Sequence, residues 1–277
     1  MPPETPAGLA IKTADTPSLR RWLRLPWDCV AALIGILYWL ILGPLLTLAA
    51  SMLLLVLPRS TGGVVGRFLI HHLFRGFALY VRMTGLVRAD TKALERIARD
   101  ERALIIAPNH LALWDAVFII ARTGRAVCVM KKSILRNPVL GGGAMLAGYI
   151  PNDGMTRMIR AASDALGCGG QLLLFPEGTR TRPDVRWINP LKGGCAIIAS
   201  RAKAPVVPVF IRSDSRFLEK GWPPWRMPVF PIRIRMDVGE PMTFGENESV
   251  QEFTRRLEEV FEAELSKPDP LRRLSDS

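Results

Sequence analysis

The chain has 277 residues, a formal net charge of +12 and a sequence pI of about 10.2. A balance this basic suits a protein that binds either nucleic acid or an anionic membrane surface. The mean hydropathy is +0.18, which is high for a soluble nucleic-acid-binding protein, and the sequence contains no DNA- or RNA-binding motif. We therefore expect membrane lipid as a partner and exclude nucleic acid. The length suits one large domain, or one domain with an appendage.

The N-terminal part of the chain divides into a polar tail and an apolar segment. Residues 1–18 contain prolines and threonines but few apolar side chains, which predicts a disordered tail. They lack the basic, apolar and small-residue order of a cleavable signal peptide. Residues 19–61 are predicted to form hydrophobic membrane-anchoring helices, because residues 29–57 include no charged side chain.

Pro44 stands in the middle of this uncharged segment, where it should kink or break a helix. As one helix the segment would reach roughly 43 Å, beyond a hydrocarbon core of about 30 Å, whereas each half would reach about 20 Å. It could form a single tilted and kinked span, or a helix–turn–helix wedge that enters and leaves by the same face. Arg24 and Arg59 flank both ends and favour the wedge or a two-helix hairpin. A buried soluble helix pair is the third alternative.

Residues 62–87 are predicted to form an amphipathic helix. Arg67, His71 and Arg75 recur every four residues and would make one basic stripe. Apolar surface would come from Val64, Phe68, Phe74, Phe77 and Val81. This pattern suits a helix that lies on an anionic leaflet, and it equally suits a domain helix whose apolar side faces the core.

A histidine and an aspartate five residues apart follow the first predicted strand. The strand, residues 103–107, is a short apolar run that should stop at Pro108, which cannot donate to a β-ladder. His110 would then lie at the carboxyl end of the strand, where open α/β sheets place their sites. Asp115 begins the next apolar segment, as a first-turn helical residue would. A turn between them can bring the carboxylate onto the imidazole.

This pair suits general-base chemistry. A neutral imidazole can accept the proton of a hydroxyl that attacks a carbonyl, and a carboxylate on the other ring nitrogen fixes the tautomer. No serine or cysteine lies in residues 109–115, so the hydroxyl can belong to the substrate. The alternative is a structural histidine capped by a nearby aspartate. We expect no metal site, because His71 and His72 lack cysteines or acids at ligand spacing.

A second motif, FPEGTR at residues 175–180, follows the apolar run 172–174. It again places a turn with a glycine, an acid and a base directly after a predicted strand. Gly178 permits close approach of the backbone, and Arg180 offers a planar fork suited to phosphate.

The order of elements predicts an α/β fold. We expect a mixed, largely parallel sheet flanked by helices and preceded by the N-terminal hydrophobic, membrane-inserted helical element, because strands and helices alternate after residue 103. The expected strands are 103–107, 126–130, 171–175, 206–211 and 232–238. The expected helices are 115–122, 156–167, 194–203 and 249–265. The predicted division is a tail (1–18), anchoring helices (19–61), an α/β domain (62–267) and a flexible tail (268–277).

The two motifs together resemble the 1-acyl-sn-glycerol-3-phosphate acyltransferases, also called lysophosphatidic acid acyltransferases. The family's NH-x4-D and FPEGTR blocks stand here in the family's order, as NHLALWD and FPEGTR. The resemblance covers roughly residues 75–245. It continues through four shorter blocks, namely KKS at 131–133, GYIP at 148–151, LKGG at 191–194 and VVPV at 206–209.

The resemblance implies an enzyme of class EC 2.3.1 that moves a fatty acyl group from a thioester donor to the free hydroxyl of a lysophospholipid. The type reaction converts 1-acyl-glycerol-3-phosphate into phosphatidic acid, with acyl-coenzyme A or acyl-carrier protein as donor and no cofactor. His110 would deprotonate the hydroxyl while Asp115 holds His110. No acyl-enzyme is needed, because the nucleophile arrives with the acceptor.

The resemblance also implies an acceptor site. Arg180 would hold the phosphate, and Glu177 would orient the loop or a substrate hydroxyl. Lys131 would be a further phosphate partner or a plain surface lysine, and Lys192 matches a family position beside the phosphate loop. The whole set is Lys131, Glu177, Gly178, Thr179, Arg180 and Lys192, with Asn109 and Pro208 in support.

One position departs from the family. Gly154 stands where relatives usually carry a basic residue, and Arg157 follows three residues later. Arg157 could reach back from the start of its helix. Alternatively the acceptor has a different head group, so that the enzyme acylates another lyso-lipid or a specialised hydroxylated product.

Location and a competing class of function complete the predictions. Bacterial relatives are similar to monotopic proteins, which implies a bacterial-type inner membrane with the catalytic domain on its cytoplasmic face. Four scattered cysteines, expected to be reduced and buried, fit that side. The competing class is a non-catalytic basic membrane-surface protein. Residues 212–230, with Trp222 and Trp225, suit either an interfacial loop or a loop packed on the domain edge.

Overall fold

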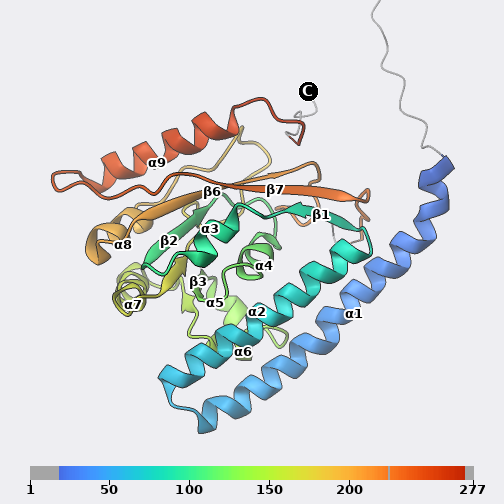
Figure 1. Ribbon diagram of the computed structural model, residues 1–277, viewed down its shortest axis with the longest axis horizontal. Coiled ribbons are helices and arrows are strands. Elements are labelled where there is room, and N and C mark those ends of the chain that lie inside the picture. Colours follow the sequence, from blue (N-terminus) through green and yellow to red (C-terminus); the bar gives the residue numbers. More distant parts are fainter. Residues whose placement is uncertain (1–18, 224, 272–277) are drawn as a thin grey trace, which may run out of the picture.

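The computed structural model describes residues 19–223 and 225–271 of the chain (Figure 1). The predicted tail 1–18, and residues 272–277 of the predicted tail 268–277, lie outside this part. The helices are α1 (Leu19–Val56), α2 (Arg59–Met83), α3 (Leu94–Arg99), α4 (Asp115–Ile120), α5 (Lys132–Leu135), α6 (Gly141–Leu146), α7 (Met155–Gly167), α8 (Gly194–Ala202) and α9 (Val250–Leu265). The strands are β1 (Val87–Asp90), β2 (Leu104–Pro108), β3 (Ala126–Met130), β4 (Ile150–Pro151), β5 (Gln171–Leu173), β6 (Val206–Ser213) and β7 (Ile232–Val238).

The strands form one sheet in the order β1-β7-β6-β2-β5-β3-β4. All neighbouring pairs are parallel except β6 and β7, which are antiparallel. Helices flank the sheet, so the predicted α/β class with a mixed, largely parallel sheet is confirmed. The carboxyl ends of β2, β5, β3 and β4 therefore meet at one edge, as parallel strands require.

All five predicted strands are present, although β5 ends at Leu173 instead of residue 175. The other two strands were not predicted. β4 has only two residues. β1 has four residues and pairs with β7, with Val87 opposite Ile232. A pairing across this sequence separation leaves no local pattern.

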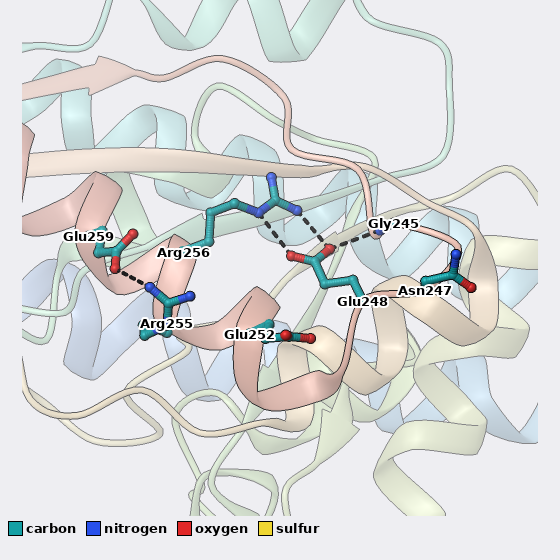
Figure 2. Close-up of a pocket in the computed structure, with 7 residues that line it drawn as sticks. All are labelled: Gly245, Asn247, Glu248, Glu252, Arg255, Arg256 and Glu259. Carbon is teal, nitrogen blue, oxygen red and sulfur yellow. Dashed lines mark hydrogen bonds and ion pairs between the residues drawn. The ribbon is translucent and has the colours of Figure 1, made fainter.

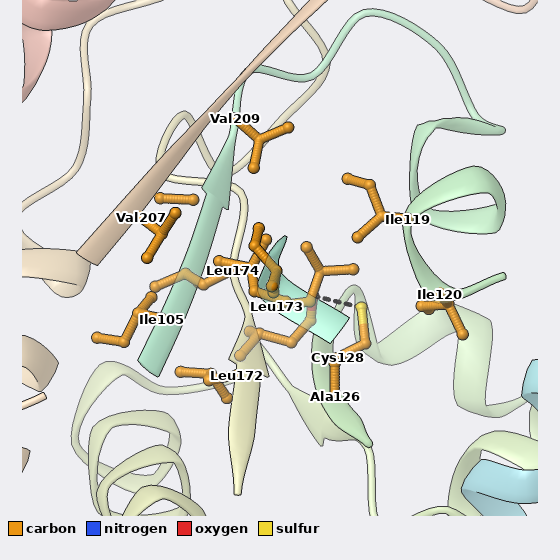
Figure 3. Close-up of a cluster of buried hydrophobic side chains, with 14 of the residues drawn as sticks. Ile105, Ile119, Ile120, Ala126, Cys128, Leu172, Leu173, Leu174, Val207 and Val209 are labelled. Carbon is orange, nitrogen blue, oxygen red and sulfur yellow. Dashed lines mark hydrogen bonds between the residues drawn. The ribbon is translucent and has the colours of Figure 1, made fainter. Parts of the chain in front are cut away.

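The core lies between the central strands and the helices that cover them (Figure 3). Ile105 of β2 pairs with Leu172 of β5, and Val207 lies on β6, the neighbour of β2 on its other side. All three residues are at most 3% exposed. Ile119 of α4 packs into the same cluster. Burial on both faces explains the continuous apolar runs of these strands.

The predicted break at Pro44 is wrong, because α1 continues through it to Val56. The chain turns instead at residues 57–58, so the hairpin consists of α1 and the antiparallel α2 (Figure 1). α1 packs on both α2 and α6, which supplies tertiary contacts that compensate the hydrogen bond lost at the proline. At Gly43 an added Cβ would lie 2.2 Å from Val139, so α1 approaches the domain closely there.

The predicted basic stripe of α2 does not face one surface. Arg67 donates to the Ala147 carbonyl at 3.1 Å, and Nδ1 of His71 lies 2.8 Å from the Ile120 carbonyl. Only Arg75 of the three is exposed. The alternative of a domain helix with its core side inward is therefore the correct one, because Phe74, among other residues, is buried.

The cysteines are free, but only Cys128 and Cys195 are buried, and burial raises the pKa of both thiols to about 12. Cys29 and Cys168 are exposed, against the prediction that all four are buried. Cys29 lies on the outer face of α1. Large apolar residues near it in the sequence are exposed as well, so an apolar neighbourhood in sequence did not indicate burial there.

Candidate active site

His110 lies two residues beyond the end of β2, and Asp115 is the first residue of α4. The intervening turn brings them together: Nδ1 of His110 donates to Oδ2 of Asp115 at 3.0 Å. The same oxygen accepts the Ala112 amide at 2.7 Å, which fixes the carboxylate. The Asp115 side chain is 3% exposed and that of His110 18%, so the acid is buried while the base has access to solvent.

The orientation of the imidazole follows from these contacts. Because Nδ1–H is committed to Asp115, Nε2 carries the lone pair that can accept a proton. The ring stacks on Phe175 with the centroids 4.0 Å apart. Phe175 begins the FPEGTR motif, so this contact joins the two motifs at the carboxyl edge of the sheet.

Glu177 connects the two loops. It is 1% exposed, and its carboxylate accepts the His110 amide at 2.8 Å, the Thr181 hydroxyl at 2.9 Å and the Asn189 amide at 2.8 Å. Burial raises the pKa of Glu177, and the hydrogen bonds from the Asn189 and His110 amides oppose that shift. Its two oxygens are engaged by the protein, which favours loop orientation over the binding of a substrate hydroxyl.

Arg180 is held next to the histidine loop. Its Nη1 donates to the Leu218 carbonyl at 2.7 Å, and the Leu113 amide donates to the same oxygen at 3.3 Å. The Thr181 amide donates to the His110 carbonyl at 2.6 Å. The histidine and the arginine motifs therefore lie at one site, on one side of the sheet.

Lys192 lies on the loop that carries Arg180. Its amide donates to the Pro176 carbonyl at 2.9 Å, and a Cβ added to Gly178 would lie 2.8 Å from its Nζ. Gly178 has φ of +68°, so a side chain there would be both strained and in collision. Thr179 is exposed between Gly178 and Arg180. Lys131 is exposed directly after β3, on the same edge of the sheet.

The two supporting residues act through the backbone of β6. Asn109 donates from Nδ2 to the Ile211 carbonyl at 3.1 Å and accepts the Ile211 amide at 2.7 Å. Pro208 pairs with Ala107 of β2 in the parallel register. Asn109 thus extends the pairing of β2 with β6 beyond the end of the ladder and holds the residue that precedes His110.

Arg157 reaches back toward the position of the family's basic residue. Its guanidinium atoms Nε and Nη2 lie 3.6 Å from a Cβ built on Gly154, and Nη2 lies 3.7 Å from Asp153. Lys132 donates to the same carboxylate at 2.5 Å. A small cationic group thus surrounds Asp153 at the carboxyl ends of β3 and β4.

Sequence reasoning missed three contributors to the site. Thr181 and Asn189 complete the bonds around Glu177, and the Leu218 carbonyl holds Arg180. Asn189 is buried and also donates from Nδ2 to the Arg180 carbonyl at 3.1 Å. A single buried asparagine in a loop gives no periodic signal, and a backbone carbonyl has no sequence signal.

A surface hollow at the start of α9 carries other charged residues (Figure 2). The Glu248 carboxylate accepts hydrogen bonds from Nε of Arg256 and from the Gly245 amide, at 2.9 Å each. Arg255 forms an ion pair with Glu259 at 2.6 Å. These charges satisfy one another and fix the helix terminus. In the part of the chain that the structure describes, no cluster of three or more His, Cys, Asp or Glu side chains could hold a metal ion.

Known proteins of similar sequence are acyltransferases. A family model described as Acyltransferase matches residues 88–212. A 1-acyl-sn-glycerol-3-phosphate acyltransferase of Pseudomonas aeruginosa is 23% identical over 252 residues, which cover 87% of this chain and 94% of the relative. A protein of the same name from Helicobacter pylori is 30% identical over 135 residues, 46% of this chain and 56% of the relative.

These comparisons support the 1-acyl-sn-glycerol-3-phosphate acyltransferase family for this chain. It is an acyltransferase of that type, as the resemblance implied. The 1-acyl-sn-glycerophosphate acyltransferase PlsC of Thermotoga maritima shares its fold, with a TM-score of 0.61 at 19% identity over 89% of this chain and 97% of the other. The family match includes both His110 and Arg180. α1 is also long and apolar enough to cross a membrane, which indicates membrane association.

Proposed function

We propose that this acyltransferase moves a fatty acyl group from a thioester to the free hydroxyl of a lysophospholipid, converting 1-acyl-glycerol-3-phosphate into phosphatidic acid. The observation that carries the proposal is a histidine oriented by a buried aspartate within the loop that binds the arginine motif. A base and an anion-binding group at one site match an acceptor that carries both a hydroxyl and a phosphate.

The transfer needs only the side chains already described. Nε2 of His110 takes the proton of the acceptor hydroxyl as its oxygen attacks the thioester carbonyl carbon. The carbon–sulfur bond then breaks, and the leaving thiolate takes the proton from the imidazolium. Asp115 stabilises that imidazolium, and no acyl-enzyme forms. Acyl-coenzyme A and acyl-carrier protein both supply such a thioester, and the reaction uses no cofactor.

The phosphate of the acceptor would meet Arg180 and Lys192. Arg180 has one amino group on the Leu218 carbonyl, which leaves the rest of its guanidinium fork for phosphate oxygens. Lys192 adds a second positive charge beside Gly178. Lys131 contributes at longer range from the end of β3.

We further propose that α1 holds the enzyme on the cytoplasmic face of a bacterial-type inner membrane. Its outer face carries exposed apolar side chains from one end to the other, including Trp27, Leu40 and Leu48. Its inner face packs on α2 and α6, so the helix would lie along the membrane surface with the domain attached. The proposed anchoring unit is thus α1 together with α2, followed by the α/β domain.

The test is release of free thiol from acyl-coenzyme A in the presence of lysophosphatidic acid. The wild type should turn over, His110→Ala should lose nearly all activity, and His72→Ala is the matched control. His72 is an exposed histidine whose Nδ1 lies 2.8 Å from the Phe68 carbonyl of the same helix, so its removal should leave the rate unchanged. Turnover by His110→Ala near the wild-type rate would refute the base, and absence of turnover in the wild type would favour the non-catalytic class.

A second acceptor is favoured by the glycine at position 154. Because Arg157 lies beside Asp153 and is 80% exposed, the charge it offers a phosphate is partly neutralised. A lyso-lipid with another head group would fit this weaker site. A panel of lyso-lipids tested with one acyl donor discriminates lysophosphatidic acid from other acceptors. If any other acceptor has a ten-fold higher kcat/KM, that lipid is the substrate and phosphatidic acid is not the main product.

A further inference from the structure

The connection between β6 and β7, the 214–231 loop, has packed ends and an exposed tip. Phe217, Leu218 and Phe230 pack against the core. The tip (Trp225, Arg226, Met227 and Val229) is exposed, with 83% of Trp225, 51% of Met227 and 59% of Val229 accessible. Three large apolar side chains exposed together on one loop indicate an interaction surface.

The start of the loop belongs to the active site. The Leu218 carbonyl accepts a hydrogen bond from Nη1 of Arg180 at 2.7 Å. Leu218 has φ of +63°, a conformation that a leucine rarely adopts. Phe217 packs edge-to-face on Trp114, with ring centroids 5.1 Å apart, and Trp114 directly precedes Asp115. The base of the loop therefore contacts both Arg180 and the residue that precedes Asp115.

The end of the loop lies next to the open end of the α1–α2 hairpin. The Ile232 amide donates to the Leu86 carbonyl at 2.9 Å. Two residues earlier, the Thr84 carbonyl accepts the indole Nε1 of Trp27 in α1 at 3.0 Å. Val229 is thus three positions from Ile232, and the end of the loop lies on the side of the domain where Trp27 of α1 is attached.

The chemistry of the tip selects lipid as its partner. Tryptophan and arginine suit the head-group layer, and Arg226 lies over the Trp222 ring with its guanidinium carbon 5.1 Å from the centroid. An anionic leaflet complements a chain of net charge +12.

We propose that the loop tip is a second membrane contact, inserted in the leaflet from which the acceptor is drawn, and that the base of the same loop places Arg180. The inference rests on the proposed membrane-bound lysophospholipid acyltransferase. Insertion at this point would bring the mouth of the site to the depth of the acceptor's phosphate. The hairpin alone would anchor the enzyme without fixing that orientation.

A contact experiment tests insertion without any need for turnover. Val229→Cys is made in full-length protein with Cys29→Ser and Cys168→Ser, labelled with an environment-sensitive fluorophore, and bound to vesicles of phosphatidylcholine and phosphatidylglycerol. Brominated lipids should quench this label strongly. Ala263→Cys is the control, since it is exposed on α9, across the sheet from α1 and α2 (Figure 1). Equal, weak quenching at both positions would overturn the proposal.

A kinetic experiment tests the coupling. The variant Trp225→Ser, Met227→Ser, Val229→Ser should acylate vesicle-bound lysophosphatidic acid about tenfold more slowly. It should match the wild type on a short-chain acceptor dissolved below its micelle concentration. The variant Trp225→Phe, Met227→Leu, Val229→Leu should restore the vesicle rate. An equal loss on both acceptors, or none on either, would overturn the inference, whereas a wild type inactive on both would refute the proposed function and leave the quenching result standing.

Discussion

A single carboxylate oxygen organises the catalytic turn. Oδ2 of Asp115 accepts both the Ala112 amide and Nδ1–H of His110, so one atom closes the turn and selects the imidazole tautomer. Glu177 holds the facing loop with both of its oxygens, which accept hydrogen bonds from His110, Thr181 and Asn189. Both acids are buried and neither is free to bind substrate, so their roles are to hold the base and the loop in place.

Replacing Asp115 by asparagine should keep the turn and remove the negative charge. An amide oxygen at the position of Oδ2 can still accept both the Ala112 amide and Nδ1–H of His110. We expect the protein to fold while kcat falls roughly 10³–10⁴-fold, because a neutral amide no longer stabilises the imidazolium that forms during transfer. Thiol release measures kcat, and a loss of less than tenfold would contradict the role assigned to the carboxylate.

Glu177→Gln should change how stability depends on pH. Burial raises the folded-state pKa of Glu177 above 4.5, so the folded state binds more protons than the unfolded state as pH rises from that value. Its contribution to the free energy of unfolding therefore falls as pH increases through the raised pKa. The difference in Tm, wild type minus Glu177→Gln, should shrink with rising pH over that window in detergent. A difference that grows instead would reverse the sign of the shift.

At the scale of elements, α2 closely approaches the end of α6. A Cβ on Gly66 would lie 2.3 Å from the Ala147 nitrogen and 2.5 Å from the Leu146 carbonyl carbon, both backbone atoms that cannot rotate away. α6 in turn packs on α1, so the hairpin is fixed to the domain through this small interface.

Gly66→Ala should therefore separate these helices and lower stability by about 1–3 kcal/mol. Gly167→Ala is the matched control, because nothing lies within 4 Å of its added Cβ at the end of α7. That control should change stability by less than about 1 kcal/mol. Thermal unfolding in detergent compares the two, and equal Tm values would show that the α2–α6 contact adapts.

Local patterns predicted the long central elements and both chemical motifs. β2 stops at Pro108 as expected, and α9 follows its apolar stripe of Phe253 and Leu257. The prediction of a helix break at Pro44 failed, because the contacts of α1 with α6 outweigh the helix-breaking tendency of proline. Asn189 and the Leu218 carbonyl join the site only through tertiary folding, so periodicity and motifs could not reveal them.

For the whole molecule, the exposed face of α1 is the dominant surface feature. Ile34, Ile41 and Leu48 recur every seven residues and are 48%, 54% and 56% exposed. α9 lies on the opposite side of the sheet in Figure 1, and its exposed residues include Glu252, Arg255 and Glu259.

Changing these three residues to lysine should release the enzyme from membranes. Each lysine costs about 2.5–3.5 kcal/mol at the centre of an inserted helix and less near the head groups. The control adds lysines at the exposed α9 positions Gln251 and Ala263, which raise the charge without touching the apolar face. Fractionation should find the α1 variant in the soluble phase and the control with the membrane. Retention of both variants in the membrane fraction would refute anchoring by α1.

The pairing of β1 with β7 sets an order of events during synthesis. Val87 leaves the ribosome directly after the hairpin, but its partner Ile232 follows 145 positions later (87↔232). The hairpin can reach a bilayer long before the sheet is closed, so the nascent domain matures while already tethered. The lipid surface would then serve as the enzyme's place of assembly as well as its place of work.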